Sequence, residues 1–304
     1  MRAAWYERQG RASDVLEVGD LEEPTPGRGE VRVRLTCSGI NPGDIKKRQG
    51  WLGSAMPYFR VIPHSDGAGV IDAVGEGVAG ARVGRRVWVY RAQSYRPFGT
   101  AAEVTVVPDA LAVDLPDRVA DETGACLGIP GITAHRAVFG DGPVTGQTVL
   151  VHGVNGGVGS LAAQLATWGG ATVIGTTRAT TVDDIRSQAP DGVDRIVEVN
   201  LAANIELDAA VAAQGCVIAS YASADGRPEL PYWPMAFQNV TLRLLGSDDF
   251  PDEVKRAATA DLTRAASEGA LTINAVILYP LEQIAQAHEA VEAGSRNGRV
   301  LLRI

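Results

Sequence analysis

A glycine-rich turn between an apolar strand and a helix constrains the fold of this chain more than any other feature. TVLVHG at 148–153 predicts a buried strand, and SLAAQLATWGG at 160–170 predicts a helix with one apolar stripe and two terminal glycines. Gly156, Gly157 and Gly159 stand between them. Such glycines let a backbone turn sharply and approach a pyrophosphate, and the N-terminus of the following helix attracts its charge. The segment therefore predicts a βαβ unit that binds a dinucleotide.

The turn departs from the common G-x-G-x-x-G pattern at its first glycine, where this chain has Val154. The turn must therefore accommodate a side chain, whereas Gly159 is expected to let the helix pack onto the strand. A tight turn that binds no ligand is the alternative interpretation. The order of strand, turn, helix and second strand favours the cofactor site, because that order is far more specific than glycines alone.

The hydrophobic pattern divides the chain into three segments. Residues 1–120 hold short alternating strands separated by glycine turns, which is typical of a compact β-rich domain. Residues 121–268 alternate apolar strands with helices, which predicts an α/β domain with a parallel sheet and, over 121–139, helices around a Pro-Gly break. Residues 269–304 end in the strand GRVLLRI and are expected to return to the first domain. The expected strands cover 31–40, 67–78, 85–91 and 101–108, followed by 148–153, 171–177, 194–199, 215–220 and 241–247.

Charge and cysteine usage narrow the range of functions. The formal net charge is −8, and such an acidic surface repels nucleic acid and anionic membranes. No run approaches the roughly 20 apolar residues of a membrane helix, and the N-terminus lacks the apolar stretch of a signal peptide. Three widely spaced cysteines argue against a disulfide framework and indicate a reducing cytoplasm.

Several segments resemble, in order, the medium-chain dehydrogenase/reductase superfamily and, within it, the zeta-crystallin-like quinone reductases. They are GINPGDIKKRQG at 39–50, PHSDGAGVIDAVGEGV at 63–78, GIPGITAHRAV at 128–138, LVHGVNGGVG at 150–159, GVDRIVEVNLAAN at 192–204 and GRVLLRI at 298–304. The resemblance covers nearly the whole chain. It implies a GroES-like catalytic domain, a Rossmann domain that binds NADPH, and an active-site cleft between the two.

The resemblance also predicts a shortened Rossmann domain. In the family, roughly another βα unit separates the second Rossmann strand from the segment that resembles GVDRIVEV. Here only RATTVDDIRSQAPD at 178–191 fills that gap. The sheet is therefore expected to lack about one βα unit on its adenine side and to keep the phosphate-binding turn.

The positions that bind zinc in other superfamily members are changed in this chain. Zinc alcohol dehydrogenases have a cysteine ligand where this chain has Asn41, and a histidine ligand where it has Ser65. Neither an amide nor a hydroxyl is a good zinc ligand. The resemblance therefore implies a metal-free enzyme. A rearranged metal site using Cys37, His64 and Asp66 is the alternative.

The resemblance carries candidate catalytic residues onto the segment after residue 40. Asn41 is expected to face the nicotinamide and to hydrogen-bond the acceptor carbonyl. Lys46 either stabilises negative charge or points into solvent, and Trp51 either stacks on a flat acceptor or caps the core. Asp44 and Arg48 also match family positions, and they are equally consistent with a structural ion pair.

The cofactor is expected to be NADPH rather than NADH. An NAD site usually has Asp or Glu about 20 residues after the glycine turn, to bind the ribose hydroxyls. That distance reaches Thr176, Thr177 and Arg178, which suit a 2′-phosphate, although Asp183 and Asp184 follow and compete for the arginine. The candidate cofactor residues are Pro130, Thr133, Asn155, Gly156, Gly157, Val158, Thr176, Thr177, Arg178, Ser220, Tyr221, Ser247, Arg296 and Asn297. For Arg178 and Arg296, a solvated loop arginine is the alternative.

These features predict a metal-free NADPH:quinone oxidoreductase. A conjugated carbonyl already accepts hydride, so the protein mainly positions nicotinamide and acceptor. An enone or alkenal double-bond reductase uses the same chemistry and is the nearest alternative, and a catalytically weak NADPH-binding sensor or crystallin-like protein is the alternative of another class. His64 and His135 are expected to be structural. The apolar strand at 239–247 predicts a homodimer joined through the edge of the Rossmann sheet.

Overall fold

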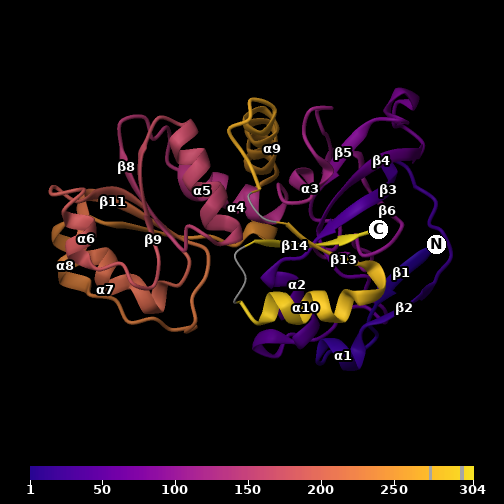
Figure 1. Cartoon of the computed structure of the whole chain (residues 1–304), viewed down its shortest axis with the longest axis horizontal. Helices are drawn as coiled ribbons and strands as arrows, with labels where there is room; N and C mark the ends of the chain where they lie inside the picture. The colour runs from indigo at the N-terminus through magenta and orange to yellow at the C-terminus, as the bar shows by residue number, and fades with distance from the viewer. Residues whose placement is uncertain (274–275, 295–297) are drawn as a thin grey trace. The chain divides into compact units, whose positions relative to one another are not determined.

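The computed structural model describes residues 1–273, 276–294 and 298–304, apart from the side chain of Leu52. The chain forms two compact units (Figure 1), one of Met1–Ile129 with Thr272–Ile304 and the other of Pro130–Leu271. None of the helices among the described residues has the length and apolar character needed to cross a bilayer.

The first unit is built on a seven-stranded sheet. Six strands follow the order β13-β14-β3-β4-β5-β7, and β6 pairs with β3. The pairs are antiparallel except that of β13 with β14. The last strand of the chain therefore lies beside β3. The strands are β3 (Glu30–Gly39), β4 (Asp66–Val74), β5 (Arg86–Val89), β6 (Val104–Pro108), β7 (Ala112–Asp114), β13 (Val276–Pro280) and β14 (Arg299–Arg303).

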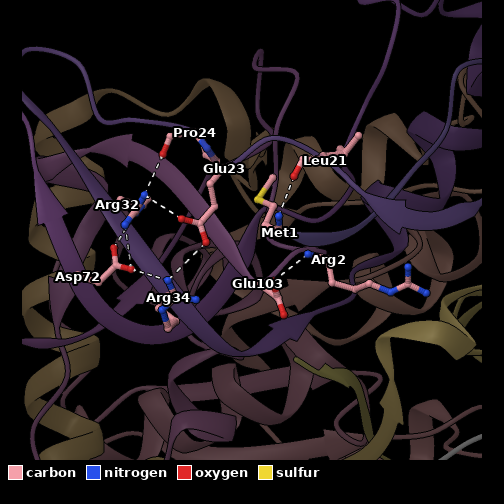
Figure 2. A network of polar contacts seen from close by, with 9 residues as sticks. All are labelled: Met1, Arg2, Leu21, Glu23, Pro24, Arg32, Arg34, Asp72 and Glu103. Atoms are coloured by element: carbon pink, nitrogen blue, oxygen red, sulfur yellow. Dashed lines mark hydrogen bonds and ion pairs between the residues drawn. The ribbon is translucent and has the colours of Figure 1, made fainter.

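A charged network supports the register of β3 and β4. Arg32 donates from Nε to Oδ1 of Asp72 at 2.8 Å, and Arg34 donates to Oδ2 of the same carboxylate at 3.0 Å (Figure 2). Glu23 pairs with both arginines. Opposite charges on neighbouring antiparallel strands favour the pairing that brings them together. A separate two-stranded sheet holds β1 (Arg2–Trp5) and β2 (Glu17–Asp20).

The short helix α2 (Pro42–Gln49) carries most of the predicted catalytic segment. The backbone N–H of Asn41, just before it, donates to the carboxylate of Asp44 at 2.8 Å. The helix ends at Gly50, whose φ of +70° requires a left-handed conformation that glycine adopts readily. Helix α10 (Ile284–Glu292) packs against α2 (Figure 1). The other short elements of this unit are α1 (Ala12–Val15), η1 (Trp51–Gly53), η2 (Gly80–Arg82), η3 (Asp109–Leu111), α3 (Asp121–Gly124) and η5 (Leu281–Gln283).

The second unit contains a parallel sheet of five strands in the order β12-β11-β10-β8-β9. A complete dinucleotide-binding sheet has six strands in the order 3-2-1-4-5-6. Here β9 and β8 take the places of strands 2 and 1, and β10 to β12 take those of 4 to 6, so strand 3 is missing from the described residues 130–271. The predicted loss of about one βα unit is confirmed. The strands are β8 (Thr148–His152), β9 (Thr172–Thr176), β10 (Val193–Glu198), β11 (Ala212–Ser220) and β12 (Thr241–Leu244).

Helices cover both faces of the parallel sheet. Helix α5 (Gly157–Trp168) packs on one face, against β8 and β9. Helices α6 (Val182–Arg186), α7 (Leu201–Val211) and α8 (Tyr232–Phe237) pack side by side on the other (Figure 1). The order of the strands in the sheet reverses after β9, because the chain returns past β8 to form β10 on its other side. Right-handed crossovers after this reversal place α6, α7 and α8 on the face opposite α5. The β-rich sheet and the parallel sheet together confirm the fold class predicted from the sequence.

The segment 121–139 differs from the prediction in one respect. Helix α4 begins at Ile129 and runs to Phe139, so Pro130 and Gly131 lie in its first turn and do not break it. Proline is tolerated there because first-turn N–H groups have no acceptor within the helix. A Cβ at Gly131 would lie 3.2 Å from Leu262 of helix α9 (Asp252–Ser267), so the glycine allows close packing.

Candidate active site and cofactor site

The glycine-rich turn leads from β8 directly into α5. Gly153 has a φ of +62°, a left-handed conformation that favours glycine. A Cβ on Gly159 would lie 2.2 Å from the carbonyl oxygen of Gly153, so the helix packs onto the turn only because residue 159 has no side chain. Asn155 and Gly156 are exposed beside the N-terminus of this 12-residue helix. Its unpaired N–H groups make that end attractive to a phosphate.

Val154 is accommodated by a glycine on the neighbouring strand. A Cβ on Gly175 of β9 would lie 3.0 Å from the Val154 side chain, so the valine occupies the space that a side chain at residue 175 would need. The departure from the usual glycine pattern therefore leaves the turn intact.

Most of the predicted cofactor residues gather along one edge of the parallel sheet. The strands end at His152, Thr176, Glu198, Ser220 and Leu244. Parallel strands have their carboxyl ends at a common edge, and open α/β sheets bind ligands there, at the point where the strand order reverses. The reversal lies between β8 and β10. The predicted residues that end these strands or follow them are Asn155, Gly156, Gly157, Val158, Thr176, Thr177, Arg178, Ser220, Tyr221 and Ser247.

The three residues predicted to bind the ribose and its 2′-phosphate differ in their surroundings. Thr176 is buried, and its hydroxyl lies 2.7 Å from Nδ1 of His152. Thr177 and Arg178 are exposed. Asp184 is engaged by Thr181, whose hydroxyl donates to it at 2.7 Å. Arg178 has no hydrogen-bond or ion-pair partner within the described residues, so its guanidinium is available to an anion.

A buried cluster of His152, Glu198 and Asp208 was missed by the sequence reasoning. His152 Nε2 lies 2.7 Å from Oδ1 of Asp208 and 3.5 Å from Oε2 of Glu198. In the described part of the chain, this is the one group of His, Cys, Asp and Glu side chains close enough to share a metal ion. Two zinc ligands at about 2.0–2.1 Å lie roughly 3.3 Å apart in tetrahedral geometry, whereas 2.7 Å is a hydrogen-bond distance. The cluster therefore shares protons.

Two side chains of the same cluster, Glu198 and His152, have pKa values above their ordinary ones and so bind protons more strongly. Burial raises the pKa of Glu198 to about 7, and the charge of Asp208 adds to this effect. Burial lowers the pKa of His152, but the hydrogen bond and charge of Asp208 and the charge of Glu198 outweigh it, so the pKa rises overall. The available sequence signal was a polar residue ending each of two apolar strands, VLVH and RIVE.

In the first unit, the amide of Asn41 is held at both ends. Nη2 of Arg299 donates to Oδ1 of Asn41 at 2.8 Å, and Nδ2 of Asn41 donates to Oδ2 of Asp66 at 2.7 Å. The backbone N–H of Ile129 lies 3.0 Å from Oδ1 and 2.9 Å from Oδ2 of the same carboxylate. Asn41 is only 3% exposed, and Asp66 is completely buried. Sequence reasoning identified Asn41 but not Arg299 or the role of Asp66 as its partner.

The two other predicted catalytic residues contact each other. The ammonium of Lys46 lies 4.2 Å from the centroid of the Trp51 ring, a cation–π distance. Trp51 is 49% exposed, so its ring does not cap the core. The pair offers an aromatic surface with a positive charge beside it.

Comparisons with known proteins identify the family of the chain. Residues 27–117 match the family model "Alcohol dehydrogenase GroES-like domain", and residues 168–302 match "Zinc-binding dehydrogenase". A quinone oxidoreductase of Mus musculus is 31% identical over 320 residues, which cover 95% of this chain and 94% of that protein. The chain belongs to the quinone oxidoreductases of the medium-chain dehydrogenase/reductase superfamily.

Two solved structures of relatives extend over the entire chain. A mycobacterial protein complexed with NADPH is 27% identical and has a TM-score of 0.84, with 100% of both chains covered. An NAD-dependent alcohol dehydrogenase is 26% identical and has a TM-score of 0.86 at the same coverage. The family therefore includes nicotinamide-dependent oxidoreductases.

The residues around Asn41 do not fit the zinc ion that the name of one family model implies. Both ends of the Asn41 amide are engaged, and the hydroxyl of Ser65 faces that of Ser94 at 3.5 Å. Cys37 is buried, and burial raises the pKa of its thiol to about 12, which disfavours the thiolate that binds zinc. The ring nitrogens of His64 are both within hydrogen-bond distance of other side chains. The described residues around Asn41 therefore do not form a zinc site.

His64 belongs to a buried hydrogen-bonded chain with a single possible direction. The chain starts at Arg48, which only donates, and ends at the backbone oxygen of Asp66, which only accepts. Each group between them must therefore accept from one neighbour and donate to the next. The order is Arg48 Nε to His288 Nδ1 (3.2 Å), His288 Nε2 to His64 Nε2 (2.8 Å), His64 Nδ1 to Ser38 (2.8 Å), Ser38 to Thr100 (2.7 Å) and Thr100 to Asp66 (2.6 Å).

Both histidines of this hydrogen-bonded series, His64 and His288, are neutral. Burial lowers the pKa of His64 to about 3 and lowers that of His288 as well. His64 has a φ of +75°, a strained conformation for a residue with a side chain, and the hydrogen bonds hold it there. The structural role expected for His64 agrees with these contacts.

The remaining predicted residues have varied positions. Pro130 and Thr133 are buried in the first turns of α4. Arg48 pairs with Glu292 and donates to the carbonyl of Gly10 as well as to His288. His135 lies 2.9 Å from the carboxylate of Asp261, in keeping with a structural role. Arg296 and Asn297 lie outside the described residues.

Proposed function

We propose that this chain is an NADPH-dependent oxidoreductase that transfers hydride to a quinone without a metal. The observation that carries the proposal is the state of Asn41, whose amide is held between the guanidinium of Arg299 and the carboxylate of Asp66. Such an amide binds a carbonyl oxygen by a hydrogen bond and replaces the Lewis acid that a zinc enzyme uses. Sequence similarity to the quinone oxidoreductase of Mus musculus supports a quinone as the acceptor.

We assign the NADPH site to the predicted domain 121–268. The turn from Asn155 to Val158 and the N-terminus of α5 bind the pyrophosphate, and Arg178 binds the 2′-phosphate. No acidic residue follows β9 directly to bind a free ribose hydroxyl, which supports NADPH over NADH. The side chains assigned to the nicotinamide end are Pro130, Thr133, Ser220, Tyr221 and Ser247.

The catalytic roles follow from the donors that the chain offers. When bound, NADPH supplies hydride to the quinone and is left as NADP⁺, and a proton from water completes the hydroquinone. Asn41 donates its second Nδ2–H to the acceptor oxygen as negative charge develops there. Trp51 stacks on the flat acceptor ring, and Lys46 stabilises the developing charge from beside that ring.

Turnover measurements test this proposal directly. We expect the purified chain to oxidise NADPH with ortho-naphthoquinone or phenanthrenequinone faster than with enones and alkenals, and to keep its rate in the presence of chelators. Faster turnover of enones would favour the double-bond reductase. Tight NADPH binding without turnover of any acceptor would favour the sensor. Stoichiometric zinc whose removal abolishes the rate would contradict the metal-free mechanism.

We further propose a homodimer joined through β12. This strand is at the edge of the parallel sheet, and its last residue, Leu244, is 72% exposed. Helix α8, just before it, exposes Trp233 and Phe237, whose rings stack at 5.6 Å. An exposed edge beside an apolar patch favours pairing with a second copy about a two-fold axis. We assign the dimer to the cytoplasm, since all three cysteines are free and buried.

A further inference from the structure

The orientation of the Asn41 amide is determined by its partners. The guanidinium of Arg299 can only donate, so the amide oxygen must face it, 2.8 Å away. The amide nitrogen therefore faces Asp66, and one of its two hydrogens is used in the 2.7 Å bond to that carboxylate. The direction of the other hydrogen is then set by the planar amide. Asp66 thus controls the one donor that Asn41 has left for a ligand.

Asp66 is itself built into a rigid position. Its carboxylate accepts from the backbone N–H of Ile129, the first residue of α4. A Cβ on Gly128 would lie 2.0 Å from Oδ1 of Asp66, so this approach requires glycine at residue 128. The backbone oxygen of Asp66 accepts from Thr100, the last donor of the buried chain that starts at Arg48. Both the backbone and the side chain of Asp66 are therefore constrained.

We propose that Asp66 is a positioning residue, which holds the amide of Asn41 so that its second N–H points at the acceptor oxygen during hydride transfer. This inference rests on the function proposed above and names a residue that the sequence reasoning considered only as a metal ligand. Only the ionised form of Asp66 serves the purpose, because both of its oxygens face N–H donors. A protonated oxygen would place a third donor against Asn41 or Ile129 and release the amide.

The ionised form is maintained against the burial of the carboxyl group. Burial raises the pKa of Asp66 to about 7, and the charge of Asp44 also raises it, whereas the Ile129 N–H, Asn41 and Arg299 lower it. Cys126, which is also close to Asp66 and Arg299, has a pKa raised by burial and stays a neutral thiol. The rate is therefore expected to fall as the pH drops through about 7.

The variant Asp66→Asn tests the inference in the full-length protein. The introduced NH2 group has to face either Ile129 or Asn41, both of which already donate. We expect kcat with ortho-naphthoquinone to fall about tenfold or more at pH 8, because a misplaced donor stabilises the transition state less. The pH step near 7 should vanish, and the Kd for NADPH should change by less than about threefold, well below the tenfold effect of a lost phosphate contact. Asp72→Asn is the matched control: it lies on the same strand and binds Arg32 and Arg34, so it should leave kcat and the pH step unchanged.

Two further variants separate positioning from a general structural effect. If Asp66 acts through Asn41, adding Asp66→Asn to Asn41→Ala should cost no further kcat, and Asn41→Ala alone should already lack the pH step. Independent losses in the double variant, or a pH step that survives in Asn41→Ala, would overturn the inference. A pH step that survives in Asn41→Ala would overturn the inference even if the Asp66→Asn protein does not fold. Absence of quinone turnover by the wild type would instead refute the proposed function, and the inference with it.

Discussion

His152 and Asp208 are joined by a buried bond of 2.7 Å between Nε2 and Oδ1, although 56 residues separate them in the sequence. His152 is the last residue of β8, immediately before the glycine turn, and Asp208 lies on α7. The second oxygen of Asp208, Oδ2, has no hydrogen-bond partner within the described residues. The bond therefore places a buried, hydrogen-bonded pair of polar side chains next to the turn assigned to the pyrophosphate.

This cluster should make stability depend on pH. The pKa of Glu198 is raised from 4.5 to about 7 and that of His152 is raised too, so both groups bind protons more tightly in the folded protein than in the unfolded chain. Their stabilisation is complete at low pH and is lost as the pH rises through the folded values. We expect the free energy of unfolding to fall by roughly 1–3 kcal/mol between about pH 5 and pH 8 through this cluster. Urea unfolding at several pH values measures it.

The variant Asp208→Asn should flatten that dependence. It removes the charge that raises the pKa of His152 and adds to the effect of burial on Glu198, so it should destabilise by about 1–3 kcal/mol at pH 5.5 and by less at pH 8.5. Asp194→Asn, at an exposed carboxylate of the same unit that accepts from the backbone N–H of Thr148, is the control and should change the unfolding free energy by the same amount at both pH values. If the unfolding free energy of Asp208→Asn varies with pH as that of the wild type does, the cluster does not bind the protons responsible for the pH dependence.

Gly159 offers a test of the glycine turn. A methyl group at this position would lie 2.2 Å from the Gly153 carbonyl oxygen, so Gly159→Ala must move α5 away from the turn. We expect a loss of about 1–3 kcal/mol in unfolding free energy and at least roughly a tenfold rise in the Kd for NADPH, about 1.4 kcal/mol. Gly226→Ala is the control, since no atom lies within 4 Å of a Cβ there. Unchanged NADPH affinity, measured by fluorescence titration, would remove this turn from the cofactor site.

Local patterns in the sequence predicted much of the fold. Apolar strands such as TVLVH and the alternating VRVRLTC carry their period in consecutive residues, and both are strands in the structure. The missing strand was predictable because it left a short connection between β9 and β10. The Pro-Gly pair at 130–131 was misread because proline has opposite meanings at the start and in the interior of a helix. Only the position of the helix start distinguishes them.

The candidate site was predictable only in part, because its contacts join distant residues. The resemblance identified Asn41, but its partner Arg299 lies 258 residues away in a segment expected to be an ordinary strand. The link from His152 to Asp208 was hidden for the same reason: neither residue has a local motif that names its partner. Thr176 shows the converse limit, since its place at the end of the second strand was predicted, but not the hydrogen bond between its hydroxyl and His152.

The exposed edge beside α8 leads to a test of the dimer. Light scattering at micromolar concentration should give twice the 31.9 kDa of the chain. Trp233→Glu combined with Leu244→Glu should reduce the mass to that of a monomer, because charge would be buried at the joined edges. Phe59→Glu, at an exposed aromatic residue of the other unit, should leave the dimer intact. A monomeric wild type would contradict the proposal.

Arg178 leads to the final prediction, a preference for NADPH over NADH. Its guanidinium is exposed just after β9 and has no partner among the described residues, and Asp184, which could have competed for it, is bound to Thr181 instead. A charge-assisted bond to the 2′-phosphate is worth about 1.5–3 kcal/mol, or roughly 10- to 150-fold in affinity. We therefore expect Arg178→Ala to lose most of the wild-type preference through a higher KM for NADPH, with NADH kinetics nearly unchanged.

Steady-state kinetics with both cofactors provide the measurement. Arg256→Ala serves as the matched control, since Arg256 is also an exposed arginine of the second unit but lies on α9, far along the chain from β9. It should leave the ratio of kcat/KM for the two cofactors unaltered, whereas Arg178→Ala should lower that ratio by about tenfold or more. The contribution of Arg178 also comes from charge, so the wild-type preference should shrink as ionic strength rises, because salt screens an exposed ion pair. Equal use of NADPH and NADH by the wild type, or an Arg178→Ala protein with the wild-type ratio, would assign the 2′-phosphate to another residue.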